Sequence, residues 1–477
     1  MSAPRADDRV RPALPAVPRT GRGRLLFVLA LVAVVTVFTA TVPLLRDWFD
    51  LRVYHGALHS WIQDDRLLYD YRVPGTAYGF TYPPFAALAM LPLAWLPLTA
   101  AIVIALLLNL AALTLVLRLL TGRAWRRHGW YGCALAACAL ALFEPLRDTF
   151  SFGQVNVLLL ALVVVDGWLL ATGRGRWAGI GIGLAAAVKL TPAIFIGLLL
   201  LAGRRRAALT ATAVAGGATA LAALAAPGAS RFYWTYALWD TDRIGRLDYV
   251  SNQSLQGILA RLGEPGRTVW ATAVLVVLAV WAVRTRRAAA DGDWQAAFAL
   301  TGLTACLVSP ITWVHHLVWL LPSFVILVRC GRTRPAALLY AVMCTSVVWL
   351  WFDDPSGLDG FLGSNTYAWI TLGLLLWLPA GQAPAVGRRL ASRITSATIP
   401  APRAAAPAIA SPAGQPGVDS SGSATAATAG AAEAAGAAAG AASGPATGRA
   451  LNASSEPTGS TRSAAWKPQS SSERASS

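Results

Sequence analysis

The stretch LLFVLALVAVVTVFTATVPLL, residues 25–45, carries no charged side chain and is long enough to cross a bilayer as a helix. Comparable apolar runs recur at 100–120, 155–171 and 207–226. Hydrophobic residues make up 56% of the 477 residues and charged residues only 13%, a composition that no soluble domain of this size requires. The sequence therefore predicts an all-α polytopic membrane protein with about 10–12 transmembrane or re-entrant helices.

The net charge of +17 comes from arginines that cluster in short loops between the apolar runs, as in Arg204-Arg205-Arg206. Basic loops stay on the cytoplasmic side of a membrane. The charge therefore indicates a membrane topology, and we expect no nucleic-acid partner. The five cysteines lie in or beside apolar runs and have neither metal-binding nor disulfide spacing.

Three parts are expected along the chain. Residues 1–23 form a cytoplasmic arm, and residues 24–394 form the membrane domain. Residues 395–477 are rich in Ala, Ser, Gly and Pro. Such a segment has too few large apolar side chains for their burial to offset the conformational entropy lost on folding, so we expect a disordered cytoplasmic tail.

Residues 178–202 have basic residues on both flanks, at 174–176 and 204–206. Because both flanks are expected inside, the stretch must enter the membrane and return. The sequence Lys189-Leu-Thr-Pro192 lies in its middle. It predicts a re-entrant hairpin of two short half-helices, which a membrane tolerates only where the break lines protein or a cavity.

Under this topology the distinctive polar motifs fall on the outer side of the membrane. They are Asp47-Trp-Phe-Asp50-Leu-Arg52-Val-Tyr54-His55, Phe80-Thr-Tyr82-Pro83-Pro84, Gly153-Gln154-Val-Asn156, Ser251-Asn252-Gln253-Ser254 and His315-His316. Each alone has a structural explanation, such as a solvated interfacial carboxylate, a satisfied histidine or a helix cap. Their placement on one side favours a functional site at a membrane mouth.

A carboxylate such as Asp50, with histidines and amides nearby, can remove a proton from a hydroxyl group. A basic group such as Arg52 or Lys189 can hold a phosphate leaving group. The sequence contains no glycine-rich nucleotide loop, which favours a lipid-linked donor. A transporter or flippase of lipid-linked sugars would instead predict inverted repeats, and the sequence has none. A structural scaffold would leave the outer polar motifs unexplained.

These motifs resemble those of the polytopic GT-C glycosyltransferases of family 87, the polyprenol-phosphate-mannose-dependent α-mannosyltransferases of actinobacteria. The matching residues are Asp50 to Tyr54, Phe80 to Phe85, Gly153 to Asn156, Lys189 to Pro192, Ser251 to Gly257, and Ser309-Pro310 through His315-His316. The resemblance covers the membrane part of the chain and leaves out the tail.

The resemblance implies a polyprenyl-phosphate-mannose donor and a glycolipid or lipoglycan acceptor on the outer face of the plasma membrane. It implies an inverting single displacement with α-(1→2) linkage, Asp50 as the catalytic base and a histidine of the His315-His316 pair in support. The other motif residues, expected to bind substrate, are Arg52, Tyr54, Tyr82, Gln154, Asn156, Lys189, Asn252 and Gln253.

Two features of the family pattern leave questions open. The first loop offers Asp47 and Asp50 in place of the adjacent acidic pair of many GT-C enzymes, so we expect no metal and no other cofactor. Some relatives transfer arabinofuranose from a polyprenyl-phosphate donor, and no residue of this sequence separates that sugar from mannose.

Overall fold

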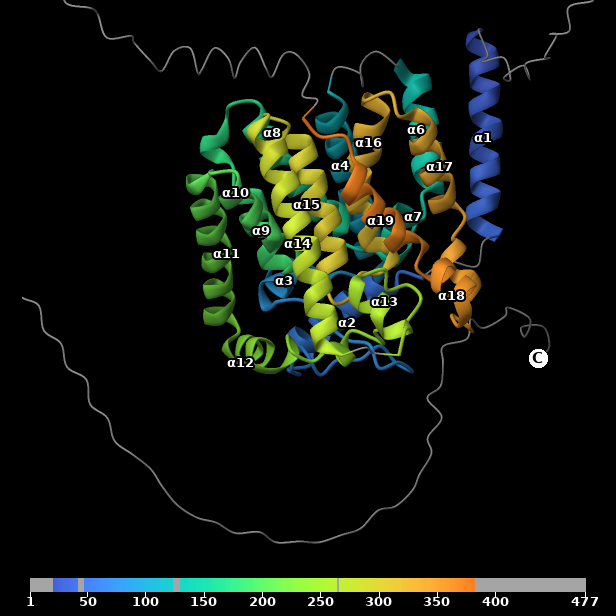
Figure 1. Cartoon of the computed structure of the whole chain (residues 1–477). Coiled ribbons are helices and arrows are strands. Elements are labelled where there is room, and N and C mark those ends of the chain that lie inside the picture. Colours follow the sequence, from blue (N-terminus) through green and yellow to red (C-terminus); the bar gives the residue numbers. More distant parts are fainter. Residues whose placement is uncertain (1–19, 42–46, 123–128, 264–265, 382–477) are drawn as a thin grey trace, which may run out of the picture. The chain divides into compact units, whose positions relative to one another are not determined.

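The computed structural model describes residues 20–41, 47–122, 129–263 and 266–381 (Figure 1). The predicted tail and residues 1–19 of the predicted arm lie outside these ranges. Within them the chain is helical, and its only β-type pairing is one isolated bridge between Arg72 and Gly79. The predicted all-α class is confirmed.

Four described helices are long and apolar enough to cross a membrane: α1 Gly21–Thr41, α4 Leu98–Thr121, α11 Arg205–Ala225 and α14 Arg267–Ala290. The pair α6 Gly129–Leu142 and α7 Glu144–Phe152 would make a fifth span, bent by 77°. Large apolar side chains on these helices point outward; Leu107, Leu224 and Leu275 are 61%, 83% and 66% exposed. Exposed leucines in such number fit contact with lipid. The protein is a polytopic membrane protein.

Shorter elements fill the space between these spans. The apolar ones are α8 Asn156–Ala171, α9 Ile180–Val188, α10 Ile194–Leu201, α15 Trp294–Val308, α16 Leu321–Arg329 and α19 Thr366–Trp377. The others are α2 Phe49–Gln63, α3 Pro84–Ala89, η1 Leu91–Trp95, η2 Gly175–Trp177, η3 Thr191–Ala193, α12 Pro227–Phe232, η4 Tyr233–Ala237, η5 Thr241–Arg243, α13 Leu255–Arg261, η6 Val314–Leu320, α17 Thr333–Cys344, η7 Val347–Trp351 and α18 Gly357–Ser364.

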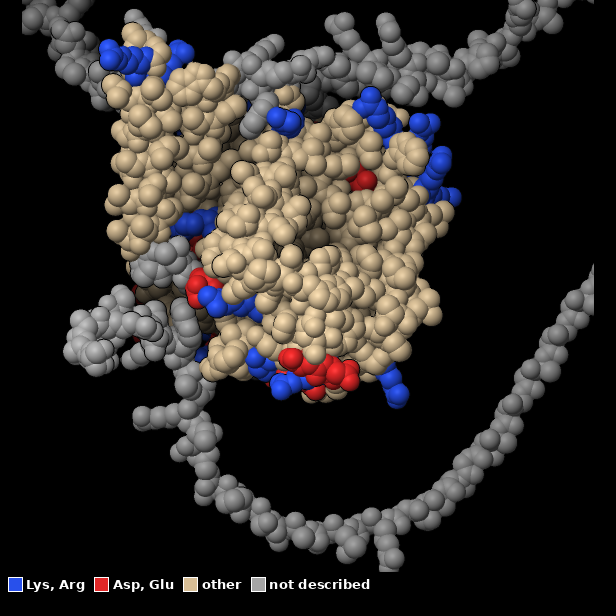
Figure 2. All heavy atoms as spheres, turned by 180° about the vertical axis from the view of Figure 1, so that it is seen from behind, with Lys and Arg blue, Asp and Glu red and all other residues tan. Residues whose placement is uncertain are grey.

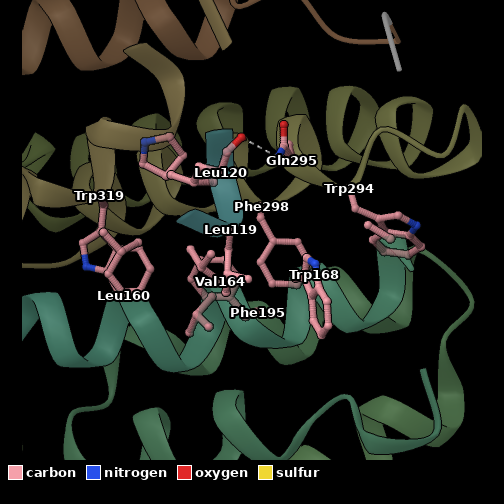
Figure 3. A pocket seen from close by; sticks show the side chains of 14 residues that line it. Leu119, Leu120, Leu160, Val164, Trp168, Phe195, Trp294, Gln295, Phe298 and Trp319 are labelled. Atoms are coloured by element: carbon pink, nitrogen blue, oxygen red, sulfur yellow. Dashed lines mark hydrogen bonds between the residues drawn. The ribbon is translucent and has the colours of Figure 1, made fainter. Parts of the chain in front are cut away.

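Helix α15 forms the centre of the core. Nearly all of its residues are buried, and it packs against α8, α14 and α19. A cavity of about 50 Å³ lies beside it and is lined mainly by apolar side chains, among them Phe195, Phe298 and Trp319 (Figure 3). At its edge Gln295 Nε2 donates to Leu120 O at 3.1 Å and ties α15 to α4. A cavity lined by apolar groups holds little ordered water.

The segment from α9 to α10 enters the bundle and returns. A Cβ atom built on Gly179, just before α9, would lie 2.3 Å from Ala207 O in the first turns of α11. The start of α9 therefore lies against the start of α11, which follows α10, and only glycine fits at this contact. Lys189 separates α9 from η3 in an extended conformation, with φ −148° and ψ 132°. The predicted hairpin with a polar break at Lys189 is confirmed as chain geometry.

The loops that carry the polar motifs gather at one end of the bundle. In Figure 1 the helices α2, α3, α12 and α13 lie at the lower end, and the turn between α10 and α11 lies at the upper end. Seen from behind, basic side chains lie along the upper rim, acidic side chains gather mainly at the lower rim with further basic ones beside them, and much of the surface between the rims is uncharged (Figure 2). This distribution matches a bilayer crossed between two aqueous sides.

Asp166 fixes where α9 begins. Its side chain is buried within α8, and Oδ2 accepts the backbone N–H of Ile182 at 2.8 Å. A helix that starts in an apolar environment has N–H groups that water does not reach, so a side-chain acceptor must satisfy them. Asp166 is therefore the interhelical anchor of the hairpin.

We expect Asp166→Ala to lower stability by about 1–2 kcal/mol, because it removes this cap from the first turn of α9. Asp166→Asn keeps an acceptor oxygen at the same position and should retain most of the stability. Thermal unfolding of the two purified variants in the same detergent measures the difference. Equal melting temperatures for the Ala and Asn variants would contradict the capping role.

Candidate active site

The chain makes an unusual entry into α2, and this entry positions Asp50. Asp47 and Trp48 have left-handed backbones, with φ 45° and 55°. The Trp48 N–H donates to Ser151 O at 2.9 Å, which ties the start of α2 to α7. Asp50 follows in the first turn of the helix. The positive end of the helix dipole favours a carboxylate there.

Gly153 brings a second motif against this turn. It ends α7 with φ 70°, and a Cβ atom at this position would lie 2.6 Å from Leu51 Cβ. Glycine allows both the left-handed backbone and the close approach. The next residue, Gln154, donates from Nε2 to Asp50 Oδ2 at 2.6 Å. The contact between α7 and α2 therefore holds the predicted base in place.

Two tyrosines extend this hydrogen-bond chain. Tyr82 OH donates to Gln154 Oε1 at 2.9 Å, and Tyr54 OH donates to Tyr82 OH at 3.0 Å. Tyr69 OH donates to the backbone carbonyl of Tyr82 at 2.8 Å and fixes the loop before Pro83. Burial and the nearby Asp50 charge raise the pKa of Tyr82, so its phenol stays protonated.

Lys189 reaches the same chain from the break of the hairpin. Its Nζ lies 3.4 Å from Tyr82 OH, 3.1 Å from Asn156 Oδ1 and 2.8 Å from His316 Nε2. Asn156 is held in turn, because its Nδ2 donates to His315 O at 3.3 Å. Residues from five separate segments of the chain therefore meet in one connected cluster.

Asp50 has the properties of a general base. Burial raises its pKa from 3.8 to about 6, while the hydrogen bond from Gln154 and the positive charge that Lys189 can carry act in the opposite direction. Only Oδ2 is bonded to the described residues, which leaves Oδ1 for a substrate. A carboxylate with a pKa near neutrality and one free oxygen can accept a proton from a hydroxyl group.

The two histidines have different surroundings. His316 faces Lys189, and its Nδ1 accepts the backbone N–H of Trp313 at 3.1 Å. The His315 side chain is buried, with its ring edge-to-face against Phe152 at 5.0 Å between centroids. The sequence did not predict that Trp313 would bind His316. The only sequence signal for this contact is that Trp313 lies three residues before His316, the spacing of a helix cap.

Arg52 forms its hydrogen bonds with Asp47 and not with the Asp50 cluster. Its Nη2 is 3.1 Å and 3.0 Å from the two carboxylate oxygens of Asp47, and its Nε donates to Asp47 O at 2.9 Å. The Arg52 and Asp47 side chains are 42% and 80% exposed. Of the two basic groups predicted to bind phosphate, the structure places only Lys189 in the Asp50 cluster.

Asn252 and Gln253 are also outside the cluster, and their polar atoms are bonded within the protein. Asn252 Oδ1 accepts Thr312 N at 2.9 Å, and its Nδ2 donates to Leu247 O and Pro310 O at 2.9 and 3.2 Å. Gln253 bonds the backbone of Val250, Ser364 and Ala368. The contacts of Asn252 hold residues 310–312, which lead to His316. Both residues remain a substrate-binding prediction that no contact here tests.

No three His, Cys, Asp or Glu side chains among the described residues are placed to hold a metal ion. The cluster therefore offers hydrogen-bond donors, one carboxylate and one amine as its chemical groups. The expectation of a reaction without a metal stays a prediction.

The known proteins that are similar to this chain are all named as mannosyltransferases. A family model described as Glycosyltransferase family 87 matches residues 80–310, a stretch that begins after Asp50 and ends before His315. No solved structure matches the chain.

Two relatives are named polyprenol-phosphate-mannose-dependent α-(1-2)-phosphatidylinositol mannoside mannosyltransferase. The one from Mycobacterium tuberculosis is 37% identical over 326 residues, which cover 63% of this chain and 75% of the relative. The one from Mycolicibacterium smegmatis is 38% identical over 306 residues, 58% of this chain and 69% of the relative. A pentamannoside mannosyltransferase from Mycobacterium tuberculosis is 31% identical over 405 residues, 80% of this chain and 92% of the relative. At these identities and lengths, the chain belongs to glycosyltransferase family 87.

Proposed function

We propose that this protein transfers mannose from polyprenyl-phosphate-mannose to a phosphatidylinositol mannoside or a related glycolipid, with α-(1→2) linkage. The names of the relatives support the donor, the acceptor class and the linkage. The observation that carries the proposal is Asp50, held through one oxygen by Gln154 and free at the other, beside the Lys189–His316 contact.

The reaction in this proposal is a single displacement. A hydroxyl oxygen of the acceptor attacks the anomeric carbon of mannose, and Asp50 Oδ1 takes the hydroxyl proton. The bond from the anomeric carbon to the phosphate oxygen breaks, and its electron pair leaves with the polyprenyl phosphate. The configuration inverts, so a β-linked donor yields an α-linked product. Lys189 lies where a cation would stabilise the charge that develops on the phosphate.

We place the cluster on the outer face of the plasma membrane. The support is the arginine distribution, because the turn between α10 and α11 carries Arg204, Arg205 and Arg206 at the end of the bundle opposite α2 (Figure 1). With that turn inside, the N-terminus and the tail are cytoplasmic, and Asp50 opens toward the outer side.

Asp50→Asn should lower mannose transfer by at least about 100-fold, because the amide keeps the shape but cannot accept the proton. Membranes that contain the variant are incubated with radiolabelled polyprenyl-phosphate-mannose, and the label in extracted glycolipids is measured. The matched control is Asp47→Asn, which removes a neighbouring exposed carboxylate and should leave transfer nearly unchanged. Wild-type rates in Asp50→Asn would overturn the assignment. The same assay with polyprenyl-phosphate-arabinose tests the alternative donor.

Transfer should also depend on pH through the ionisation of Asp50. Its raised pKa of about 6 means that the carboxylate is protonated, and unable to act as a base, at lower pH. With saturating donor, the rate should fall about tenfold per pH unit below about pH 6 and level off above it. Initial rates from pH 4.5 to 8 measure this profile. A rate that stays flat down to pH 4.5 would exclude Asp50 as the base.

A further inference from the structure

The contacts of His316 define which of its nitrogens carries a proton. Nδ1 accepts the backbone N–H of Trp313 at 3.1 Å, so it has no proton of its own. A neutral imidazole then carries its proton on Nε2. This Nε2–H points at Lys189 Nζ, 2.8 Å away. His316 is therefore the donor in this contact, and Lys189 must be the acceptor.

The other two contacts of Lys189 are with acceptors. Tyr82 OH donates its own proton to Gln154 Oε1, so it presents a lone pair to Nζ. Asn156 Nδ2 donates to His315 O, so its Oδ1 faces Nζ. One donor and two acceptors surround Nζ. A neutral amine, with two N–H groups and one lone pair, satisfies all three, whereas an ammonium group has three N–H groups and no lone pair.

The surroundings do not neutralise a charge on Lys189. Among the described residues the ion pairs are Arg52–Asp47 and Arg246–Asp248, and Lys189 belongs to neither. Asp50 on α2 acts on it through space, and Gln154 and Tyr82 lie between them in the hydrogen-bond chain. An unpaired ammonium in such a site is costly.

The remaining titratable groups near the pair are a thiol, an imidazole and two phenols. Cys306 on α15 donates through Sγ to His316 O at 3.8 Å. The His315 ring lies edge-on to the His316 ring at 4.6 Å between centroids. Tyr54 and Tyr82 are phenols bonded to each other. None of these groups supplies the negative charge that an ammonium at Lys189 would need.

We propose that Lys189 is a neutral amine in the empty site and takes up one proton when the phosphate of the lipid donor binds. The amine lone pair accepts a proton from solvent, and no other bond forms or breaks. The phosphate oxygens then accept N–H groups from both Lys189 and His316, in place of the contact between them. The Tyr82 ring, 5.0 Å from Nζ, lies where it stabilises the new cation.

The identity of the anion rests on the proposed function, but the neutral amine does not. The charge would arise only when a phosphate is present to compensate it. At lower pH the proton that Lys189 takes up is more abundant, so the attraction between its ammonium group and the phosphate adds more to donor binding. Donor affinity should therefore weaken as the pH rises.

The sequence offers a direct test, because the chain contains only two lysines, Lys189 and Lys467. Protein labelled with ¹³Cε- and ¹⁵Nζ-lysine should give two signals, and Lys467→Arg assigns the one from Lys189. At pH 8.5, where an ordinary lysine is still an ammonium, the Lys189 signal should have the shift of a neutral amine, and it should move to the ammonium position when polyprenyl-phosphate-mannose is added without acceptor. An ammonium shift in the empty protein would overturn the proposal, whatever the donor.

Binding of the same donor provides the second measurement. Polyprenyl-phosphate-mannose is a phosphodiester whose single charge is constant over the range used, so any pH dependence comes from the protein. In the wild type, Kd should rise about tenfold per pH unit over the range in which Lys189 is protonated in the donor complex but neutral in the empty site. Lys189→Arg carries a permanent charge and should bind with a Kd that varies less than about twofold between pH 6 and 9.

Lys467→Arg is the control, and its Kd should follow the wild type. Melting temperatures verify that both variants fold. A pH-independent Kd in the wild type would overturn proton uptake. If the donor does not bind at all while the empty-site shift is that of a neutral amine, the proposed function fails and the neutral amine stands.

Discussion

The side-chain amide of Gln154 joins Asp50 to Tyr82. Through it four segments of the chain are held together: α2, the loop before α3, the turn that carries Gln154, and the break of the hairpin at Lys189. Nε2 donates to Asp50 on α2, and Oε1 accepts from Tyr82 in the loop before α3. Through Tyr82 the chain of hydrogen bonds reaches Lys189 at the break of the hairpin. At the end of an apolar bundle every buried polar group needs a partner, because water is scarce there. An apolar residue at this position would leave Asp50 and Tyr82 without their partners and separate α2 from the hairpin.

Much of the fold was predictable because the requirements of a membrane act along the sequence in one dimension. Apolar length marks the spans, and arginines mark one side. The hairpin at Lys189 followed from two basic flanks that could not both be satisfied by a single crossing. Asp50 stood out because a carboxylate beside aromatics at the end of a span is rare. In each case a local pattern was sufficient.

What the sequence could not predict is which side chains pair in three dimensions. Arg52 and Lys189 looked equivalent as phosphate ligands, yet Arg52 is satisfied by Asp47 five residues earlier. The Asn252 and Gln253 amides were expected to bind substrate, and nothing in the sequence indicated that their oxygens accept the backbone N–H groups of Thr312 and Ala368; the substrate-binding prediction itself stays untested. Glu144 carried no sequence prediction, yet it is buried and accepts from Trp349 Nε1 at 2.7 Å and from Tyr367 OH. Except for the local Arg52–Asp47 pair, these contacts join residues far apart in the sequence, up to 223 positions for Glu144 and Tyr367, and no local pattern encodes them.

The charge state of Lys189 and the basicity of Asp50 are linked in this arrangement. A permanent ammonium close to Asp50 would stabilise the carboxylate and lower its pKa, which would make it a weaker base. With a neutral amine, only the hydrogen bond from Gln154 opposes the effect of burial, so the pKa of Asp50 stays above its ordinary value, which suits proton abstraction near neutrality. When the lipid phosphate arrives, its negative charge and the proton taken up by Lys189 cancel, so Asp50 experiences little net change. The protein can then hold an anionic leaving group near its base without weakening that base.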